Sequence, residues 1–270
     1  MKAHRFTWLL VAALGGALLF PGAADAIDGS EHSSLYYEQQ QSMEELSQLS
    51  GEEFEQGYIN RVIPHHEGAL DMAQIMVYKA PNQDTRDLSE MAIKTQAEEI
   101  NQLATWQQQW YGQPVSPNPA FVLPDSIPQS LEADSPEVAE AAFLLMFREH
   151  HQSVIEMSEM LLEREELPHY DELAPMARMV IEGQNEQQQM MADYAQEFYG
   201  IEAPTPVTGD IPLGRQLALQ QLEQATAEGE ALPDTGGVEL APRAGLTLPL
   251  SGLGLLAAGA GVYALRRRFD

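Results

Sequence analysis

Adjacent histidines occur twice in the chain, as His65-His66 and as His150-His151. Each pair is followed, two helical turns further on, by a methionine, Met72 in the first case and Met157 in the second. Imidazole is a common metal ligand, and the thioether sulfur of methionine is a soft one. The repeated pattern therefore predicts a site for a soft-to-borderline metal ion.

Helical geometry gathers the first set of these side chains. At about 100° per residue, with His65 at zero, Met72 falls at roughly 340°, Met76 at roughly 20° and His66 at roughly 100°. All four lie within the apolar arc of the predicted helix. The polar neighbours point the other way and are expected on the surface, not among the ligands: Glu67, Asp71, Gln152 and Glu156.

The second pair repeats the arrangement less regularly. With His150 at zero, Met160 lies about 80° away on the helical wheel. Met146, on the preceding turn, lies at about 320° and is an alternative ligand to Met160. No inward-facing carboxylate is predicted on either histidine helix. The predicted metal ligands are His65, His66, Met72, Met76, His150, His151, Met157 and Met160.

A plain core is the alternative interpretation of both patterns. Buried histidines normally find hydrogen-bond partners inside a fold, and methionine fills irregular gaps between helices. Under this interpretation the histidines only tie the helices together. The sequence leaves both interpretations open.

Composition narrows the chemistry. The chain has 270 residues, 44% of them hydrophobic, a formal net charge of -27 and no cysteine. The lack of cysteine excludes disulfides, zinc-thiolate sites and a thiol nucleophile. The strong negative charge excludes a basic footprint for nucleic acid, so a metal ion is the expected partner.

The beginning of the chain predicts export. Residues 1–26 combine the basic residues Lys2 and Arg5 with an apolar run and the small-x-small sequence Ala24-Asp25-Ala26. This order is typical of a secretory signal peptide that is cleaved after Ala26.

The end of the chain predicts a surface anchor. Leu232-Pro233-Asp234-Thr235-Gly236 precedes an apolar segment, residues 244–265, and a basic tail, residues 266–270. The segment is long enough to cross about 30 Å of hydrocarbon. This order resembles a cell-wall sorting signal, in which sortase cleaves between Thr235 and Gly236. The alternative is an uncut membrane anchor.

Between these segments the pattern predicts helices over residues 42–79, 85–111, 137–166 and 170–199. An internal repeat divides them into two helical hairpins, residues 27–112 and 137–200, joined by a proline-rich linker, residues 113–136. A stalk, residues 201–231, follows. The predicted fold is all-α, a four-helix bundle of ferritin-like type made of two repeated helical hairpins.

Two glutamines lie in the middle of the apolar arcs of the helices that partner the histidine helices. Gln96 and Gln184 are equivalent in the two repeats. A buried glutamine needs partners, so each is predicted to orient a histidine from outside the ligand shell. The alternative is a helix-to-helix hydrogen bond with no metal.

The string Ile63-Pro64-His65-His66, with Met72-Ala73 after it and Ile93, Gln96, Glu99 and Trp106 in the next helix, resembles the family called domain of unknown function 305. The second half resembles it less well, because Arg148-Glu149 stands before the histidines and Ser158 follows Met157. The resemblance implies a ferritin-like helical fold. It also implies copper binding through histidine and methionine, since the family includes secreted copper-binding proteins.

These features bear on three classes of function. An envelope-tethered protein that sequesters or transfers copper agrees best with the paired histidines, the methionines and the predicted anchor. A structural or partner-binding surface bundle without metal is the alternative. A di-metal oxidase needs two Glu-x-x-His motifs on separate helices, and the chain has one, Glu166-Leu167-Pro168-His169, so no enzymatic activity is predicted.

Overall fold

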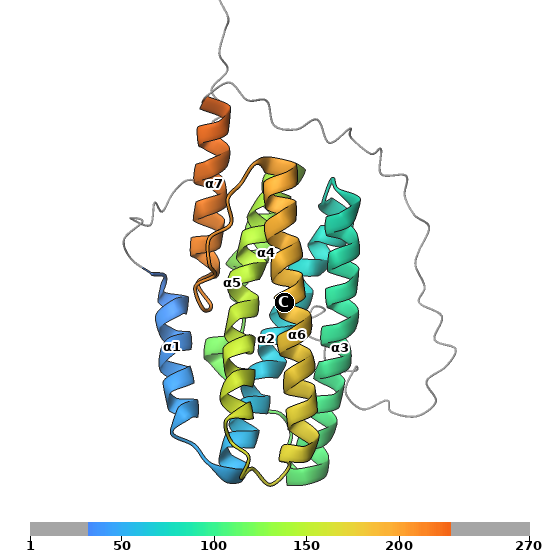
Figure 1. Cartoon of the computed structure of the whole chain (residues 1–270), viewed down its shortest axis with the longest axis vertical. Helices are drawn as coiled ribbons and strands as arrows, with labels where there is room; N and C mark the ends of the chain where they lie inside the picture. The colour runs from blue at the N-terminus through green and yellow to red at the C-terminus, as the bar shows by residue number, and fades with distance from the viewer. Residues whose placement is uncertain (1–31, 228–270) are drawn as a thin grey trace, which may run out of the picture. The chain divides into compact units, whose positions relative to one another are not determined.

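The computed structural model describes residues 32–227, and within that range it contains α-helices, one 3-10 turn and no strand (Figure 1). The all-α prediction is therefore confirmed. The elements are α1 (Ser34–Ser47), α2 (Gly51–Lys79), α3 (Gln83–Tyr111), η1 (Pro119–Phe121), α4 (Ser126–Ala133), α5 (Pro136–Leu162), α6 (Tyr170–Tyr199) and α7 (Ile211–Ala227).

Four long helices form the bundle that the sequence predicts. α2 packs on α3 and α5 packs on α6 as two hairpins, and α2 lies against α5. The two histidine helices run antiparallel, because the start of α2 lies near the end of α5, where the hydroxyls of Tyr58 and Ser158 are 3.0 Å apart. Apolar residues fill two buried clusters along the bundle.

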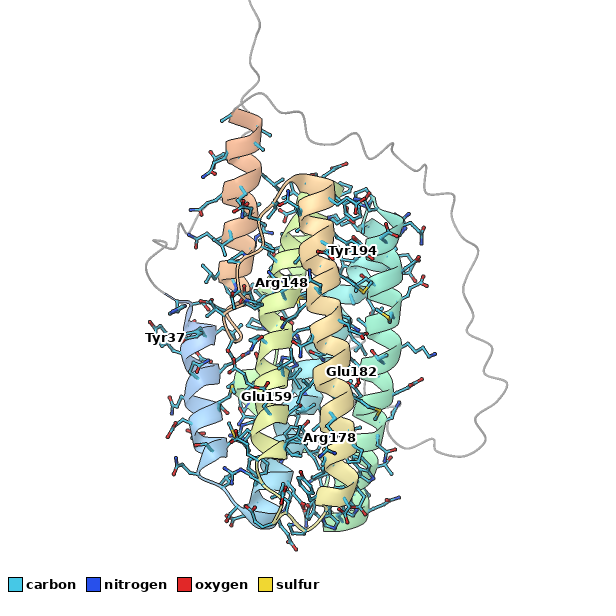
Figure 2. All side chains as sticks on the ribbon, in the orientation of Figure 1. Tyr37, Arg148, Glu159, Arg178, Glu182 and Tyr194 are labelled. Carbon is cyan, nitrogen blue, oxygen red and sulfur yellow. The ribbon has the colours of Figure 1, made fainter. Side chains whose placement is uncertain are left out.

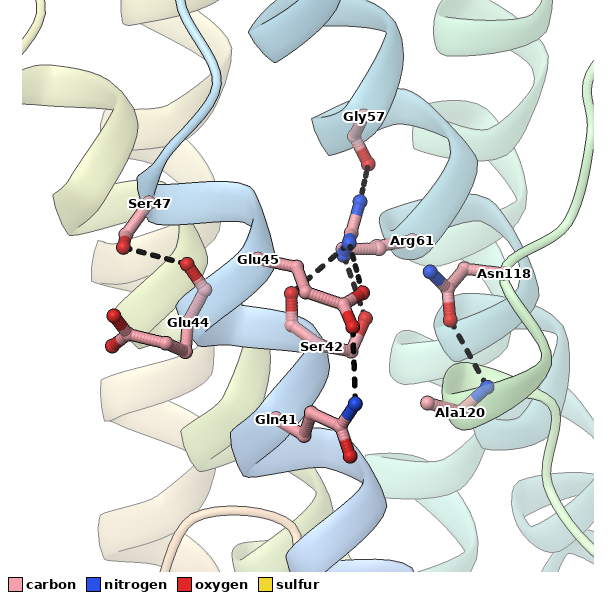
Figure 3. A network of polar contacts seen from close by, with 9 residues as sticks. All are labelled: Gln41, Ser42, Glu44, Glu45, Ser47, Gly57, Arg61, Asn118 and Ala120. Carbon is pink, nitrogen blue, oxygen red and sulfur yellow. Dashed lines mark hydrogen bonds and ion pairs between the residues drawn. The ribbon is translucent and has the colours of Figure 1, made fainter.

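The predicted first helix, residues 42–79, is two helices. The chain turns at Gln48–Ser50, and Gly51 opens α2 with φ +53°, a left-handed conformation that glycine adopts without steric cost. Arg61 of α2 then holds α1 in place by donating to the hydroxyl and the carbonyl oxygen of Ser42, at 2.9 and 3.0 Å (Figure 3). The periodicity runs across the turn, which is why the sequence did not reveal the break.

Pro64 lies inside α2 without ending it. Proline has no N–H, so the carbonyl oxygen of Asn60, four residues earlier, loses its helical partner. The backbone N–H of Asn118, at the start of η1, donates to that oxygen at 2.8 Å. The segment after α3 thus satisfies the carbonyl that the proline frees, immediately before the first histidine pair.

The linker and the stalk both contain helices. η1 and α4 lie within residues 113–136, and Lys79 at the end of α2 donates to the carbonyl oxygen of Leu131 at 2.7 Å. α7 lies within residues 201–231 and packs on α5, where a Cβ on Gly214 would meet the backbone of Leu145 at 2.9 Å. Residues 201–227 are therefore part of the folded unit.

The predicted signal peptide (residues 1–26), the sorting motif (residues 232–236), the apolar segment (residues 244–265) and the basic tail all lie outside the described residues. From residue 32 to residue 227, no helix combines the length and the apolar character needed to cross a membrane.

A buried carboxylate ties one end of the bundle together. Glu55 of α2 is fully buried, accepts a hydrogen bond from the hydroxyl of Tyr111 at the end of α3, and lies 2.8 Å from Nδ1 of His169, the residue before α6. His169 is the histidine of the Glu-x-x-His motif, and in the structure it contacts Glu55. Its ring also stacks on Trp110.

The equivalent residues tie the other end. Glu140 of α5 accepts from the hydroxyl of Tyr199 at 2.5 Å and from the side-chain amide of Asn82 at 2.8 Å. The prediction that the histidine helices carry no inward carboxylate was thus wrong, because Glu55 and Glu140 are both fully buried. Tyrosine and polar partners at the bundle ends make their burial tolerable.

Candidate metal centre

The two histidine pairs meet in the middle of the bundle. All four rings are buried, with exposed fractions of 2% or less: His65, His66, His150 and His151. The rings of His65 and His150 stack with centroids 3.7 Å apart and planes 30° apart. Nε2 of His65 lies 2.8 Å from the carbonyl oxygen of His150. The four residues therefore form one layer, which we call the histidine layer.

Each outer histidine contacts the partner helix of its own hairpin. Nε2 of His66 lies 2.8 Å from Oε2 of Glu99 on α3, and Nε2 of His151 lies 2.7 Å from Oε1 of Gln187 on α6. The His151 contact has hydrogen-bond geometry, whereas the His66 contact is close but not aligned. These contacts occupy the Nε2 side of each ring and leave Nδ1 to face a ligand.

One nitrogen of every ring in the histidine layer lacks a partner. Nδ1 is buried in all four histidines and makes no hydrogen bond with any residue that the structure describes. Buried polar atoms are hydrogen-bonded in the great majority of cases. The four Nδ1 atoms are therefore the candidate ligand atoms of the layer.

Burial also controls the protonation of the layer. It lowers the pKa of His65 and of His150 well below the ordinary value, and the neighbouring histidines lower it further. Burial lowers the pKa of His151 to about 4, although the contact with Gln187 opposes the shift. These three imidazoles are neutral at pH 7, which is the form that binds a metal.

The predicted methionine ligands lie on both sides of the histidine layer. Met72 and Met76 belong to the apolar cluster that includes Phe147, whereas Met157 belongs to the cluster around Tyr58 at the other end. Met160 is only partly buried. Methionine sulfur atoms therefore lie on both sides of the histidine layer. Met72 and Met157 each follow the first histidine of their pair by two helical turns.

The donor chemistry of the layer fits a soft-to-borderline metal. Neutral imidazole and thioether suit copper better than magnesium or calcium, which prefer oxygen ligands. Among residues 32–227, no three histidine, aspartate or glutamate side chains stand ready around one ion. The histidine layer supplies imidazole nitrogens. On each histidine helix, the methionine two turns further along is the soft donor that could complete the coordination of an ion.

The two predicted outer-shell glutamines are buried but do not bond to histidine. Gln96 and Gln184 are 2% and 4% exposed, and neither amide makes a hydrogen bond within the described part of the chain. Glu99 and Gln187, one turn further along α3 and α6, make the histidine contacts instead. Sequence reasoning missed their role, although the repeat offset that relates Gln96 to Gln184 also relates this pair.

The polar neighbours of the histidines are less exposed than expected. Glu67 and Asp71 are half-buried, and each takes part in an interaction of its own. Gln152 donates to Glu156 at 3.1 Å, and Glu156 also accepts from the hydroxyl of Thr208. The segment before α7 contacts this side of α5, which leaves Gln152 and Glu156 half-buried.

Comparison with known families gives a partial match. The family described as a domain of unknown function, DUF305, matches residues 23–107 and, in an overlapping alignment, residues 55–140. This part of the chain resembles DUF305. The matched stretch includes His65, His66 and Glu99, and it ends in α5 before the second histidine pair. No curated protein matches the chain.

Solved structures give a distant likeness. CopM in the Cu(II)-bound form is 25% identical over 54% of this chain and 97% of its own, with a TM-score of 0.47. CopM in the Cu(I)-bound form is 27% identical over 54% and 98%, with the same score. A DUF305 protein from Streptomyces coelicolor is 22% identical over 53% and 91%, again at 0.47.

Proposed function

We propose that the protein binds a soft-to-borderline metal ion in the histidine layer, and that copper is the preferred metal. The observation that carries the proposal is the set of four buried Nδ1 atoms without hydrogen-bond partners. An apolar core would not leave four ring nitrogens unpaired in one layer, because each unpaired buried group costs about 1–3 kcal/mol. A metal ion would satisfy several of them at once.

Copper is favoured by the donors that the chain offers. The chain contains twelve methionines and no cysteine, so imidazole and thioether are its soft-to-borderline ligands. Met72, Met76 and Met157 are completely buried on the helices that carry the histidines. Such a set suits Cu(I), while the carboxylate of Glu99 beside His66 offers an oxygen that suits Cu(II).

Sequestration or transfer at the cell envelope is the role we propose for this binding. The signal-peptide pattern in residues 1–26 supports export, and the order of residues 232–236, 244–265 and 266–270 supports a tether made by sortase or by an uncut membrane segment. The negative charge of the chain would attract cations to its surface.

A structural bundle without metal is the second candidate. The Nε2 atoms of His65 and His151 already bond to His150 and Gln187, so these histidines do tie helices together. In that case the protein would serve as a surface or partner-binding module.

Metal content separates the two candidates. The protein, purified without a metal-binding tag, would be equilibrated with Cu(I), Cu(II), Zn(II) and Fe(II), washed and analysed for bound metal. We expect copper to be retained and to raise the thermal midpoint of unfolding, since a ligand that binds only the native state stabilises it. Retention of no metal would leave the structural bundle.

A further inference from the structure

A cleft separates α3 from α6 at the level of the histidine layer. Its volume is about 380 Å³. Both helices line it with residues at equivalent positions of the two repeats, and polar and thioether side chains predominate. The lining residues used below are Gln96, Glu99, Met179, Gly183, Gln184 and Gln187.

The cleft lies on the side of the bundle that the accessory helices leave uncovered. α1, η1 and α4 pack on α2, while α4 and α7 pack on α5. Figure 1 shows α1 and α7 on the side of the bundle away from α3. Within residues 32–227, the histidine helices are thus covered from outside, and the gap between their partner helices offers the direct way in.

The floor of the cleft reaches the histidine layer. Glu99 and Gln187 line the cleft, and their side-chain oxygens also lie 2.8 and 2.7 Å from Nε2 of His66 and His151. A single side chain therefore stands between the cleft and each outer histidine. Displacement of either contact would open the ring nitrogen to the cleft.

Two buried amides in the cleft have no partner. Gln96 and Gln184 are at least nine-tenths buried, line the cleft from opposite helices, and make no hydrogen bond in the described part of the chain. Burying two amides without hydrogen-bond partners costs free energy unless another molecule or ion hydrogen-bonds to them. Water or the hydration shell of an ion passing through the cleft would supply that partner.

A soft donor stands where α6 meets solvent. Met179 lines the cleft and is 64% exposed, which is unusual for a large apolar side chain. Thioether sulfur binds Cu(I) in preference to hard cations. An exposed methionine in the cleft therefore offers a soft first contact, and Glu99, which lines the same cleft, offers an oxygen contact closer to the histidines.

We propose that the cleft between α3 and α6 is the entrance through which copper reaches the histidine layer. Met179 makes the outer contact, and Glu99 and Gln187 make the inner contacts that give way to the ion. This inference rests on the proposed function, because it assigns a route to the same site.

Gly183 allows the route to be blocked without disturbing the core. A Cβ added to Gly183 would meet no atom within 4 Å, and the residue lies on the cleft side of α6. Gly183→Phe should therefore fill the cleft while preserving the helix. Asn185→Phe is the matched control, because Asn185 is an exposed, uncharged residue of α6 outside the cleft lining. Figure 2 shows the outer surface of α6, with Arg178 and Glu182 labelled.

The first measurement is the rate at which the protein takes up Cu(I) from a coloured chelator complex. The decrease in the absorbance of that complex reports the uptake. We expect Gly183→Phe to slow uptake by about tenfold or more, as when access requires a conformational change, and to leave the final copper content unchanged. Asn185→Phe should match the wild type in both rate and content.

The second measurement needs no metal. Diethyl pyrocarbonate modifies neutral imidazole, and mass spectrometry would follow its reaction with His66 and His151 in the metal-free protein. Gly183→Phe should slow modification of these two residues relative to Asn185→Phe. Modification of the partly exposed His32 should proceed equally in both variants.

The outcomes separate the route from the function. Normal copper content with equal uptake and modification rates in both variants would overturn the cleft as the entrance and leave the metal site standing. Equal slowing in both variants would also overturn it. A wild-type protein that takes up no copper would overturn the proposed function, and the route with it.

Discussion

Glu99 and Gln187 occupy equivalent positions in the two repeats, and each contacts the second histidine of its own hairpin, His66 or His151. One contact carries a negative charge and the other is neutral. The two halves of the histidine layer therefore share a geometry but differ in electrostatics. A cation bound near His66 would be stabilised by Glu99, whereas one near His151 would meet only the dipole of an amide.

Glu99→Gln tests this asymmetry. The substitution keeps the shape and one oxygen but removes the charge, so copper affinity should fall about tenfold to a hundredfold, as when an outer-shell partner of a ligand is lost. Competition with a chelator would measure it. Glu90→Gln is the control, because Glu90 is an exposed carboxylate of the same helix outside the cleft lining. Equal losses in the two variants would mean that only the general negative charge matters.

Replacement of both stacked histidines tests the site itself. His65→Ala combined with His150→Ala should abolish tight copper uptake, because it removes the centre of the layer, while circular dichroism should still report a helical protein. His32→Ala combined with His169→Gln removes as many histidines away from the layer. Retention of tight binding by the first variant would place the metal elsewhere in the chain.

The sequence predicted most of the bundle because its signals are periodic. The repeat offsets placed the two histidine helices and their partners, and the helical wheel placed both histidine pairs on the buried face. α7 was missed because its packing depends on a close approach of Gly214 to the backbone of Leu145, a contact that leaves no periodic pattern. The role of Glu99 depends on helix-to-helix register, which spacing within one helix cannot reveal.

The burial of Glu55 and Glu140 was missed for a related reason. A charged residue near a helix end is normally read as surface, and its burial is explained only by partners far away in the sequence. Tyr111 is 56 residues from Glu55, and Tyr199 is 59 residues from Glu140. The signal that could have found them is the repeat itself, since the offset between the carboxylates matches that of the two histidine pairs.

Removal of the two tyrosine hydroxyls tests these ties. Tyr111→Phe and Tyr199→Phe should each lower the free energy of unfolding by about 1–3 kcal/mol, because each leaves a buried carboxylate with one partner fewer. The ties lie at opposite ends of the bundle, so the losses should add in the double variant. Urea unfolding would measure them.

Tyr78→Phe is the control for the tyrosine variants, because Tyr78 is 73% exposed. It should change the free energy of unfolding by no more than about 0.5 kcal/mol. A loss as large as that of Tyr111→Phe would show that the hydroxyls at the bundle ends contribute nothing special.

Glu140 gives the stability of the protein a dependence on pH. Burial raises the pKa of its carboxyl, although hydrogen bonds from Tyr199 and Asn82 oppose the shift. The folded state therefore holds this proton more tightly than the unfolded chain. The resulting stabilisation is complete below the pKa of the unfolded chain and is lost as the pH rises through the pKa of the folded state.

Glu140→Gln removes this titration and keeps an oxygen that accepts from Tyr199 and Asn82. The stability of the variant relative to the wild type should rise as the pH increases above the ordinary pKa of a glutamate carboxyl, with a slope of at most about 1.4 kcal/mol per pH unit. Urea unfolding of the metal-free protein would measure it. Glu159→Gln, at an exposed position further along the same helix, should show no such trend. A difference between Glu140→Gln and wild type that stays constant with pH would show that Glu140 titrates alike in the folded and unfolded states.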